Sequence, residues 1–266
     1  MKPAACAFAL LLCVSGVAAQ TPSRAQLVLT ILGGGISGHS LWDVSKQAVA
    51  VDTIQNDTLH LRRDVSSSVV LGASATYFFS PQFGMHAEIS YMGLPMDDSC
   101  TPVHIVPSDA ARIQAVCDDI ASRAGSGGAI SLFVGATLRA SAAKALSPYV
   151  RGNIGIVSMP HSYVEVFGNY FVTGIGPQQL SVIKDLSPRS GAPYFGLAAG
   201  LTQPLSKSGG YQIRLELRDA ITSFERVAGP ADPETQIAPT EIKTYHHLSL
   251  TLGLDVVLEK SRGRRH

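Results

Sequence analysis

The residues best placed to do chemistry are the charged side chains of segment 211–219, Tyr-Gln-Ile-Arg-Leu-Glu-Leu-Arg-Asp. Up to position 217 apolar residues hold the odd positions and polar residues the even ones. This period of two predicts a β-strand with one apolar and one polar face. The polar face carries Arg214, Glu216 and Arg218. If that face is enclosed, its opposite charges must form ion pairs, whereas on a soluble sheet they would meet water.

Three short histidine pairs are candidates for catalysis or metal binding: His39-Ser40, His161-Ser162 and His246-His247. No acidic residue stands at a spacing diagnostic of a catalytic triad, and Ser–His pairs this close in sequence recur by chance. No CxxC motif accompanies them. We therefore predict a protein that is not an enzyme and that holds neither a cofactor nor a metal.

The first residues are organised like a secretory signal. Lys2 precedes an apolar run over 4–14, and Val17-Ala18-Ala19 forms a small-residue cleavage site, so we expect residues 1–19 to be removed and the mature chain to begin at Gln20. A lipoprotein signal at Cys13 is the alternative, which Leu12 disfavours. The apolar run is too short for a retained membrane helix.

The composition of the mature chain limits the possible partners. Removing residues 1–19 leaves equal numbers of basic and acidic residues, which argues against nucleic acid. Cys100 and Cys117 then remain as the only cysteines, and an even pair in an exported protein predicts a disulfide. The mean hydropathy of +0.19 is high, yet no later run reaches the ~18 apolar residues of a membrane helix. Only a closed barrel could then enter a membrane.

Alternating runs organise the rest of the chain. They cover 26–36, 68–79, 83–94, 129–140, 149–157, 193–205, 211–219 and 247–258. Each is close to the ~10 residues that a tilted strand needs to cross a bilayer. Connections 80–82, 141–148 and 206–210 are short, and 37–67, 95–128, 158–192 and 223–246 are long. An even number of strands with this asymmetry predicts an up-and-down barrel with long loops facing outward.

The polar faces of these runs carry small polar residues and a few charges, as expected of a narrow lumen. The later lysines fall in predicted turns, loops or the tail: Lys46, Lys144, Lys184, Lys207, Lys243 and Lys260. Aromatic residues are predicted to form two interfacial bands. One band holds Tyr77, Phe79, Phe83, Tyr149 and Tyr211, and the other holds Trp42, Tyr91, Phe195, Phe224 and Tyr245.

The predicted inward charges are Glu88, Arg139, Arg151, Arg214, Glu216, Arg218 and Asp219. An eight-stranded barrel is only wide enough for its own side chains. We expect these charges to form a salt-bridge network that plugs the lumen, with a narrow ion path as the alternative. Once the barrel closes, Glu88 or Asp255 could serve as a cross-strand partner of the charges in 211–219.

Three features resemble the small outer-membrane β-barrel proteins of the OmpA, OmpX and OmpW type. They are the turn 80–84 followed by Glu88 and Tyr91, the strand with Arg214, Glu216, Arg218 and Asp219, and the leucine-rich last strand. The resemblance covers nearly all of 24–258. It implies an eight-stranded antiparallel transmembrane barrel over 20–258, located in the outer membrane. It also implies contact with outer-membrane lipid and lipopolysaccharide, and insertion by the barrel-assembly machinery.

The end of the chain resembles the signal read by that machinery. Thr251, Gly253, Val256 and Leu258 fall at its polar, glycine and two hydrophobic positions. Leu258 replaces the usual terminal aromatic residue, and a basic tail over 259–266 follows. In the second long connection, 108–120 has apolar residues at helical spacing and predicts a short helix, ending near Gly125 and joined by Cys117 to Cys100.

These features predict a barrel with a structural or surface-recognition role, or one that binds a small apolar ligand among its long loops. The alternatives are an outer-membrane lipid-modifying enzyme, a narrow channel for small apolar or ionic solutes, and a soluble periplasmic barrel whose apolar face lines a cavity.

Overall fold

The computed structural model describes residues 26–50, 56–123, 125–140, 146–158, 164–185, 191–205 and 210–259. The predicted signal segment, His161-Ser162 and the tail after Glu259 lie outside these residues. The first strands are β1 (Gln26–Ile36), β2 (His39–Ala50), β3 (Asn56–Val65), β4 (Ser68–Phe78) and β5 (Phe83–His104), followed by helix α1 (Ala110–Ser122). The later strands are β6 (Gly125–Arg139), β7 (Ser147–Ser158), β8 (Val166–Val172), β9 (Gly176–Ile183), β10 (Gly191–Pro204), β11 (Tyr211–Val227) and β12 (Thr240–Glu259).

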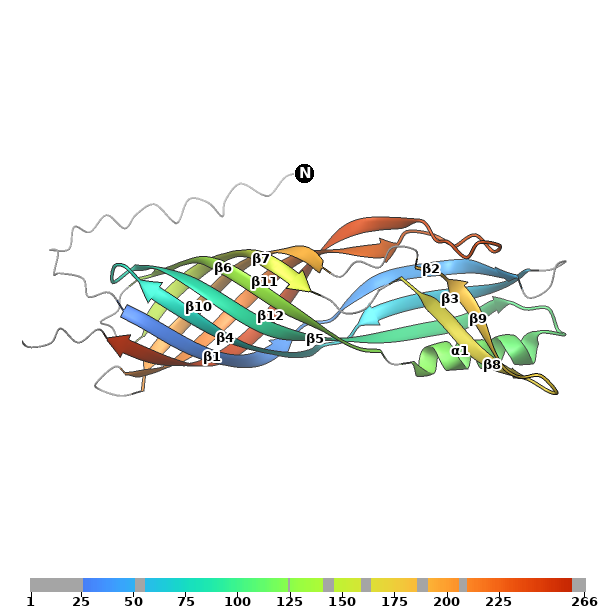
Figure 1. Ribbon diagram of the computed structural model, residues 1–266, viewed down its shortest axis with the longest axis horizontal. Coiled ribbons are helices and arrows are strands. Elements are labelled where there is room, and N and C mark those ends of the chain that lie inside the picture. The colour runs from blue at the N-terminus through green and yellow to red at the C-terminus, as the bar shows by residue number, and fades with distance from the viewer. Residues whose placement is uncertain are drawn as a thin grey trace, which may run out of the picture.

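Eight of the described strands close into a barrel in the order β1-β4-β5-β6-β7-β10-β11-β12 (Figure 1). Closure comes from two antiparallel pairings, β5 with β6 and β12 with β1. Gln26 pairs with Glu259, so the two ends of the barrel chain lie side by side. The predicted eight-stranded antiparallel up-and-down barrel is confirmed, and each predicted alternating run forms one of its strands.

The outer wall of the barrel is apolar and its inner wall is largely polar. On β12, Leu248, Leu250, Leu252 and Leu254 are 45–59% exposed, whereas Ser249 and the other alternate residues point inward and are buried. A soluble protein would bury the leucines, so this belt is suited to hydrocarbon. The helix of the described structure, α1, is too short and too polar to span a membrane.

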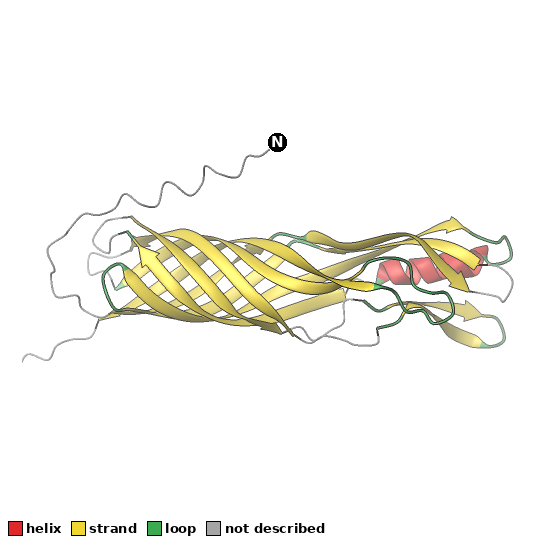
Figure 2. Ribbon diagram, turned by 90° about the horizontal axis from the view of Figure 1, so that it is seen from above, coloured by secondary structure: helices red, strands yellow, loops and turns green. Residues whose placement is uncertain are grey.

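The four connections predicted as long loops contain regular structure. Strands β2 and β3 form a hairpin, β8 and β9 form a separate two-stranded sheet, and β5, β11 and β12 continue beyond the barrel (Figures 1 and 2). We call β2, β3, 95–104 of β5, α1, β8, β9 and 223–246 the surface extension. Lys46 and Lys243 lie in its strands, which corrects the prediction that they occupy loops. Strands beyond an apolar wall meet water, so they tolerate lysine.

The surface extension has a hydrophobic core of its own. Trp42, Phe224 and Tyr245 are 3–6% exposed and belong to it, and the Tyr245 hydroxyl donates to the Leu41 carbonyl at 2.8 Å. The prediction that these three join an interfacial band is wrong, as it is for Tyr149, which is buried in the lumen. The other predicted band residues are 40–54% exposed: Tyr77, Phe79, Phe83, Tyr91, Phe195 and Tyr211.

Helix α1 packs on the extension through one apolar face. Its buried residues are Ile113, Val116, Cys117 and Ile120, the positions that the sequence predicts. Asp109 precedes the first turn and makes no side-chain capping bond. The predicted disulfide between Cys100 and Cys117 is confirmed, with the two Cα atoms 4.9 Å apart, and it ties α1 to β5.

Replacing Cys117 with serine is expected to loosen α1 while leaving the barrel intact. A bridge that closes a loop of this length, 17 residues in sequence, contributes about 3 kcal/mol by restricting the unfolded chain. Limited proteolysis of the protein in lipid vesicles measures the effect, with faster cleavage expected only within 105–123. Reduction of the disulfide in the parent protein with dithiothreitol should cause the same faster cleavage. Unchanged cleavage in both cases would contradict the assigned role.

Candidate functional site

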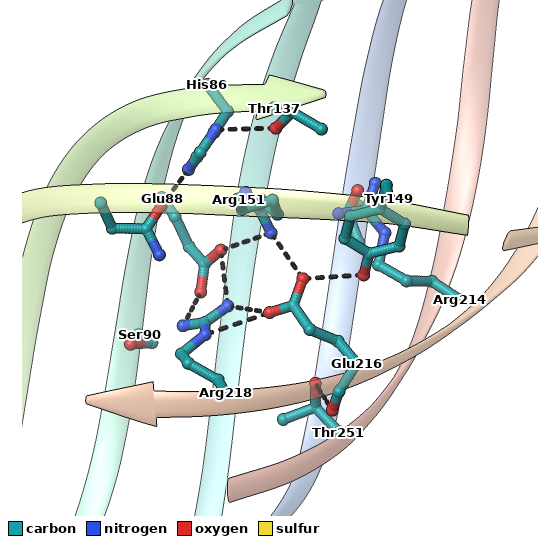
Figure 3. A network of polar contacts seen from close by, with 12 residues as sticks. His86, Glu88, Ser90, Thr137, Tyr149, Arg151, Arg214, Glu216, Arg218 and Thr251 are labelled. Atoms are coloured by element: carbon teal, nitrogen blue, oxygen red, sulfur yellow. Dashed lines mark hydrogen bonds and ion pairs between the residues drawn. The ribbon is translucent and has the colours of Figure 1, made fainter. Parts of the chain in front are cut away.

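Four charged residues meet at the centre of the barrel lumen (Figure 3). Glu88 lies on β5, Arg151 on β7, and Glu216 and Arg218 on β11, and each side chain is at most 4% exposed. All four point inward by the strand alternation. Ala198 on the intervening β10 pairs with both Arg151 and Arg218. This small residue leaves room for the longer side chains of its two neighbours.

Arg218 is the centre of this cluster. Its Nη1 and Nη2 donate to the two oxygens of Glu88 at 2.7 and 3.1 Å, and its Nε and Nη2 donate to Glu216 Oε1 at 3.0 and 2.6 Å. Arg151 Nη1 lies 3.1 Å from Glu216 Oε2 and 3.3 Å from Glu88 Oε2. The Tyr149 hydroxyl donates to Glu216 at 2.8 Å. Two cations and two anions thus form a neutral lumen cluster, as burial in a low-dielectric interior requires.

A second ion pair lies beside it. Arg214 donates from Nε and Nη2 to Asp255 Oδ2 at 3.2 and 3.0 Å, and the Thr30 hydroxyl donates to Asp255 Oδ1 at 2.8 Å. The guanidinium lies 5.2 Å from the centre of the Tyr149 ring. The alternation of Asp255 with Leu254 and Val256 predicts that it lies on the inward face of the last strand, where it can pair with the charges of segment 211–219. The structure places it there, as the partner of Arg214.

Further side chains fill the lumen around the cluster. The rings of Phe133 and Tyr194 stack with centroids 4.9 Å apart, and Arg218 lies 5.1 Å from the Phe133 ring. His86 shares hydrogen bonds with Asn153 at 2.5 Å and Thr137 at 3.0 Å. At the end nearest the surface extension, six buried residues of the barrel belong to the same hydrophobic core as the extension: Ile36, Val70, Met92, Leu94, Ala129 and Val157.

Two predicted lumen charges lie outside the lumen cluster. Arg139 faces inward, because it alternates with the exposed Leu138, and it is half-buried near the short turns, where it donates to the Pro81 carbonyl at 2.6 Å and to Gln26 at 2.9 Å. Asp219 points outward, because it is the odd-numbered neighbour of Arg218, and it pairs with His246 Nδ1 at 2.8 Å. The prediction that Asp219 faces the lumen is therefore wrong.

Of the candidate catalytic histidines in the described chain, His39 and His247 lie side by side, whereas His246 is exposed on the outer wall. His247 Nε2 and the Thr222 hydroxyl are 2.9 Å apart, and both residues are 1% exposed. The ring of His39 lies 4.6 Å from that of His247. Within the described ranges, no three His, Cys, Asp or Glu side chains gather in a way that could hold a metal.

His39 is expected to make the surface extension less stable in mild acid. Burial lowers the pKa of His39 below 6.5 and Lys243 lowers it further, whereas Asp64 raises it. As the pH falls, His39 is therefore protonated in the unfolded chain before it is protonated in the folded one. The stability present above pH 6.5 is consequently lost as the pH falls towards the pKa of the folded protein. His39→Phe keeps a ring against Tyr245 and should give a flatter pH profile in proteolysis of the extension. If the pH profile of His39→Phe is identical to that of the parent, His39 does not cause the loss of stability in acid.

The four positions of the predicted assembly signal lie on β12. Thr251 and Gly253 are buried and face the lumen, Val256 is half-buried, and Leu258 is 46% exposed on the outer wall. Recognition by the assembly machinery remains a prediction.

No family model and no curated protein sequence matches the chain. Its fold is similar to that of OprG, an outer membrane protein of Pseudomonas aeruginosa, with 9% identity over 90% of this chain and 98% of OprG and a TM-score of 0.46. It is also similar to the outer membrane protein AlkL (11% identity, 93% and 96% covered, TM-score 0.44) and to Neisserial surface protein A (10%, 87% and 97%, 0.41). At these identities the likeness concerns the fold alone. The strand order itself makes the chain a closed eight-stranded antiparallel barrel.

Proposed function

We propose that the chain is a non-conducting outer-membrane barrel that holds a folded surface extension outside the cell. Its role would be structural or in surface recognition. The observation that carries the proposal is the filled lumen beneath a folded extension. The lumen cluster blocks the centre of the barrel, and the apolar core shared with the extension covers its outer end. An ion following this path would have to displace buried side chains.

The apolar belt and the chain ends support the proposed orientation. Barrels of this kind place their short turns in the periplasm and their longer connections outside. The turn 79–82 after β4 and the last residues of β6 and β10 lie at the same end as Gln26 and Glu259, and the surface extension lies at the other end (Figure 1). Outer-membrane lipid, including lipopolysaccharide, is the proposed partner of the belt. The barrel-assembly machinery is the proposed partner of the last strand.

A non-enzymatic role is favoured by the burial of the hydroxyl–imidazole pairs. Thr222 with His247, and Thr137 with His86, are all at most 4% exposed, so a substrate could not reach them. The exposed pair of Asp219 and His246 has the geometry of a base and its orienting acid. In the described part of the chain, however, no hydroxyl hydrogen-bonds to the other nitrogen of His246.

Electrical recording tests the closed lumen. The purified protein in planar bilayers is expected to give no stepwise conductance, whereas a porin reconstituted in the same way should conduct. Stable conductance steps from the parent protein would favour the narrow-channel alternative.

Cell fractionation tests the location and orientation separately. The protein should remain in the outer-membrane fraction and change its gel mobility on heating. Protease added to intact cells should cut only the surface extension. Recovery in the periplasmic supernatant without detergent would support the soluble carrier instead.

A further inference from the structure

The apex of the β8–β9 hairpin exposes two large apolar side chains. Phe171 and Ile175 are each 72% exposed, more than the other large apolar residues described in the surface extension. The hairpin from Val166 to Ile183 also contains no charged residue. An apolar, uncharged apex is unusual at a position that faces water.

Neither side chain is required by the fold of the turn. Gly174 and Gly176 have φ angles of 85° and 101°, in the left-handed region that favours glycine, and they provide the reversal of the chain. Ile175 stands between them in an exposed turn, where polar residues are usual. Phe171 pairs across the hairpin with Pro177, on a face left open to solvent. A serine at either position would fit the same backbone.

The hairpin is held firmly at its base. Gly168 packs so closely on α1 that a Cβ atom there would lie 2.7 Å from the Val116 carbonyl oxygen. The Asn169 amide donates to Asp119 at 2.7 Å, and the Lys184 amide donates to the Gln236 carbonyl at 2.8 Å. The Cys100–Cys117 disulfide anchors α1 in turn. The apex therefore projects from a rigid support, at the end of the molecule opposite the barrel (Figure 1).

We infer that this apex inserts into the surface of a second lipid bilayer facing the cell. Two side chains offer at most a few hundred Å² of apolar surface, well below the ~800 Å² per partner of a stable protein interface. An aromatic and an aliphatic side chain on an uncharged hairpin suit the boundary between headgroups and acyl chains. No carboxylate in the hairpin would repel anionic headgroups. The inference rests on the proposed outward orientation of the extension.

Vesicle flotation tests the inference. The full-length barrel is reconstituted in lipid nanodiscs and mixed with phosphatidylcholine vesicles, with and without anionic phosphatidylglycerol. The parent should float with the vesicles, and Phe171→Ser/Ile175→Ser should reduce the bound fraction about tenfold or more. The matched control, Val103→Ser/Ile242→Ser, removes two apolar residues that are 54% and 59% exposed elsewhere on the extension. It should stay within about twofold of the parent.

A fluorescent reporter tests insertion directly. Trp42, the single tryptophan of the chain, is buried, so the additional emission of Phe171→Trp reports on the apex. Vesicles of brominated phosphatidylcholine should quench that emission. Heat-dependent gel mobility shows that each variant is folded, and protease accessibility on cells tests the orientation independently.

Two results would overturn the inference. The first is a parent protein that does not float with either vesicle type while its extension is accessible on cells. The second is pairing of nanodiscs through the apex, without quenching by brominated lipid, because the occupant would then be a second copy of the chain.

Discussion

Replacing Glu216 with alanine is expected to cost the barrel about 3–5 kcal/mol in unfolding free energy, the range typical of breaking a buried ion pair. Glu216 is fully buried and accepts hydrogen bonds from Tyr149, Arg151 and Arg218. Without it, two arginines share the single carboxylate of Glu88. Urea unfolding from lipid vesicles, followed by heat-dependent gel mobility, measures the loss.

Leu215→Ala is the matched control on the adjacent residue. Leu215 is 43% exposed on the outer wall, where lipid chains can occupy the space left by the lost side chain. Leu215→Ala should therefore reduce the unfolding free energy clearly less than Glu216→Ala does. In a soluble barrel the apolar face would instead form the core. Leu215→Ala would then cost ~2–5 kcal/mol of unfolding free energy, whereas Glu216 would be a solvated surface residue whose loss costs little. A greater loss for Leu215→Ala would therefore refute both the facing of the barrel and its proposed place in a membrane.

Asp98→Ala should open the surface extension without unfolding the barrel. Arg63 donates from Nε and Nη2 to the two oxygens of Asp98 at 2.5 and 2.7 Å, and it also donates to the Glu165 carbonyl at 3.1 Å. These bonds connect β3, β5 and the segment before β8. Removing one carboxylate from such a buried pair should cost ~3–5 kcal/mol. Hydrogen exchange should rise through the extension and stay slow in the barrel strands.

The neighbouring pair of Arg62 and Asp64 provides the control for this effect. Its side chains are 48% and 33% exposed and 2.8 Å apart. Asp64→Ala should cost at most about 1 kcal/mol, as usual for solvated ion pairs. Equal exchange in the two variants would mean that the buried pair does not hold the extension together.

The alternation of single strands was enough to predict the wall of the barrel and much of its lumen. Glu216 and Arg218 are two residues apart on one strand, so their common face could be read directly. The sequence offered Glu88 or Asp255 as their partners but could not assign the pairs, and it did not single out Arg151 as a partner, because these residues belong to other strands that only barrel closure brings together. Asp219 was wrongly assigned to the lumen because it is charged. Its odd number places it with Leu215 and Leu217 on the outward face.

Apart from helix α1, the surface extension was not predicted as regular structure, because its strands interrupt the period of two. In β2 the register against β3 shifts between Ser40 and Trp42 and again between Val44 and Gln47. Leu41 and Trp42 are consequently both buried although they are adjacent. Gln47 is fully buried as well, and it bonds both the amide and the carbonyl of Ala231. Such side-chain-to-backbone pairing leaves no periodic signal.

One hydrophobic core joins the barrel to the surface extension, through Ile36, Val70 and Met92 on the barrel side. This shared core limits which sequence changes the protein can accept. Connections of small barrels are usually exchangeable parts, since a shorter or longer loop leaves the wall unchanged. Here a transplanted loop would uncover apolar residues at the mouth of the lumen and expose them to water. Sequence change should therefore be confined to the solvent-facing positions of the extension and to the apex of the β8–β9 hairpin. At the other positions, the sequences of the barrel mouth and of the surface extension must change together.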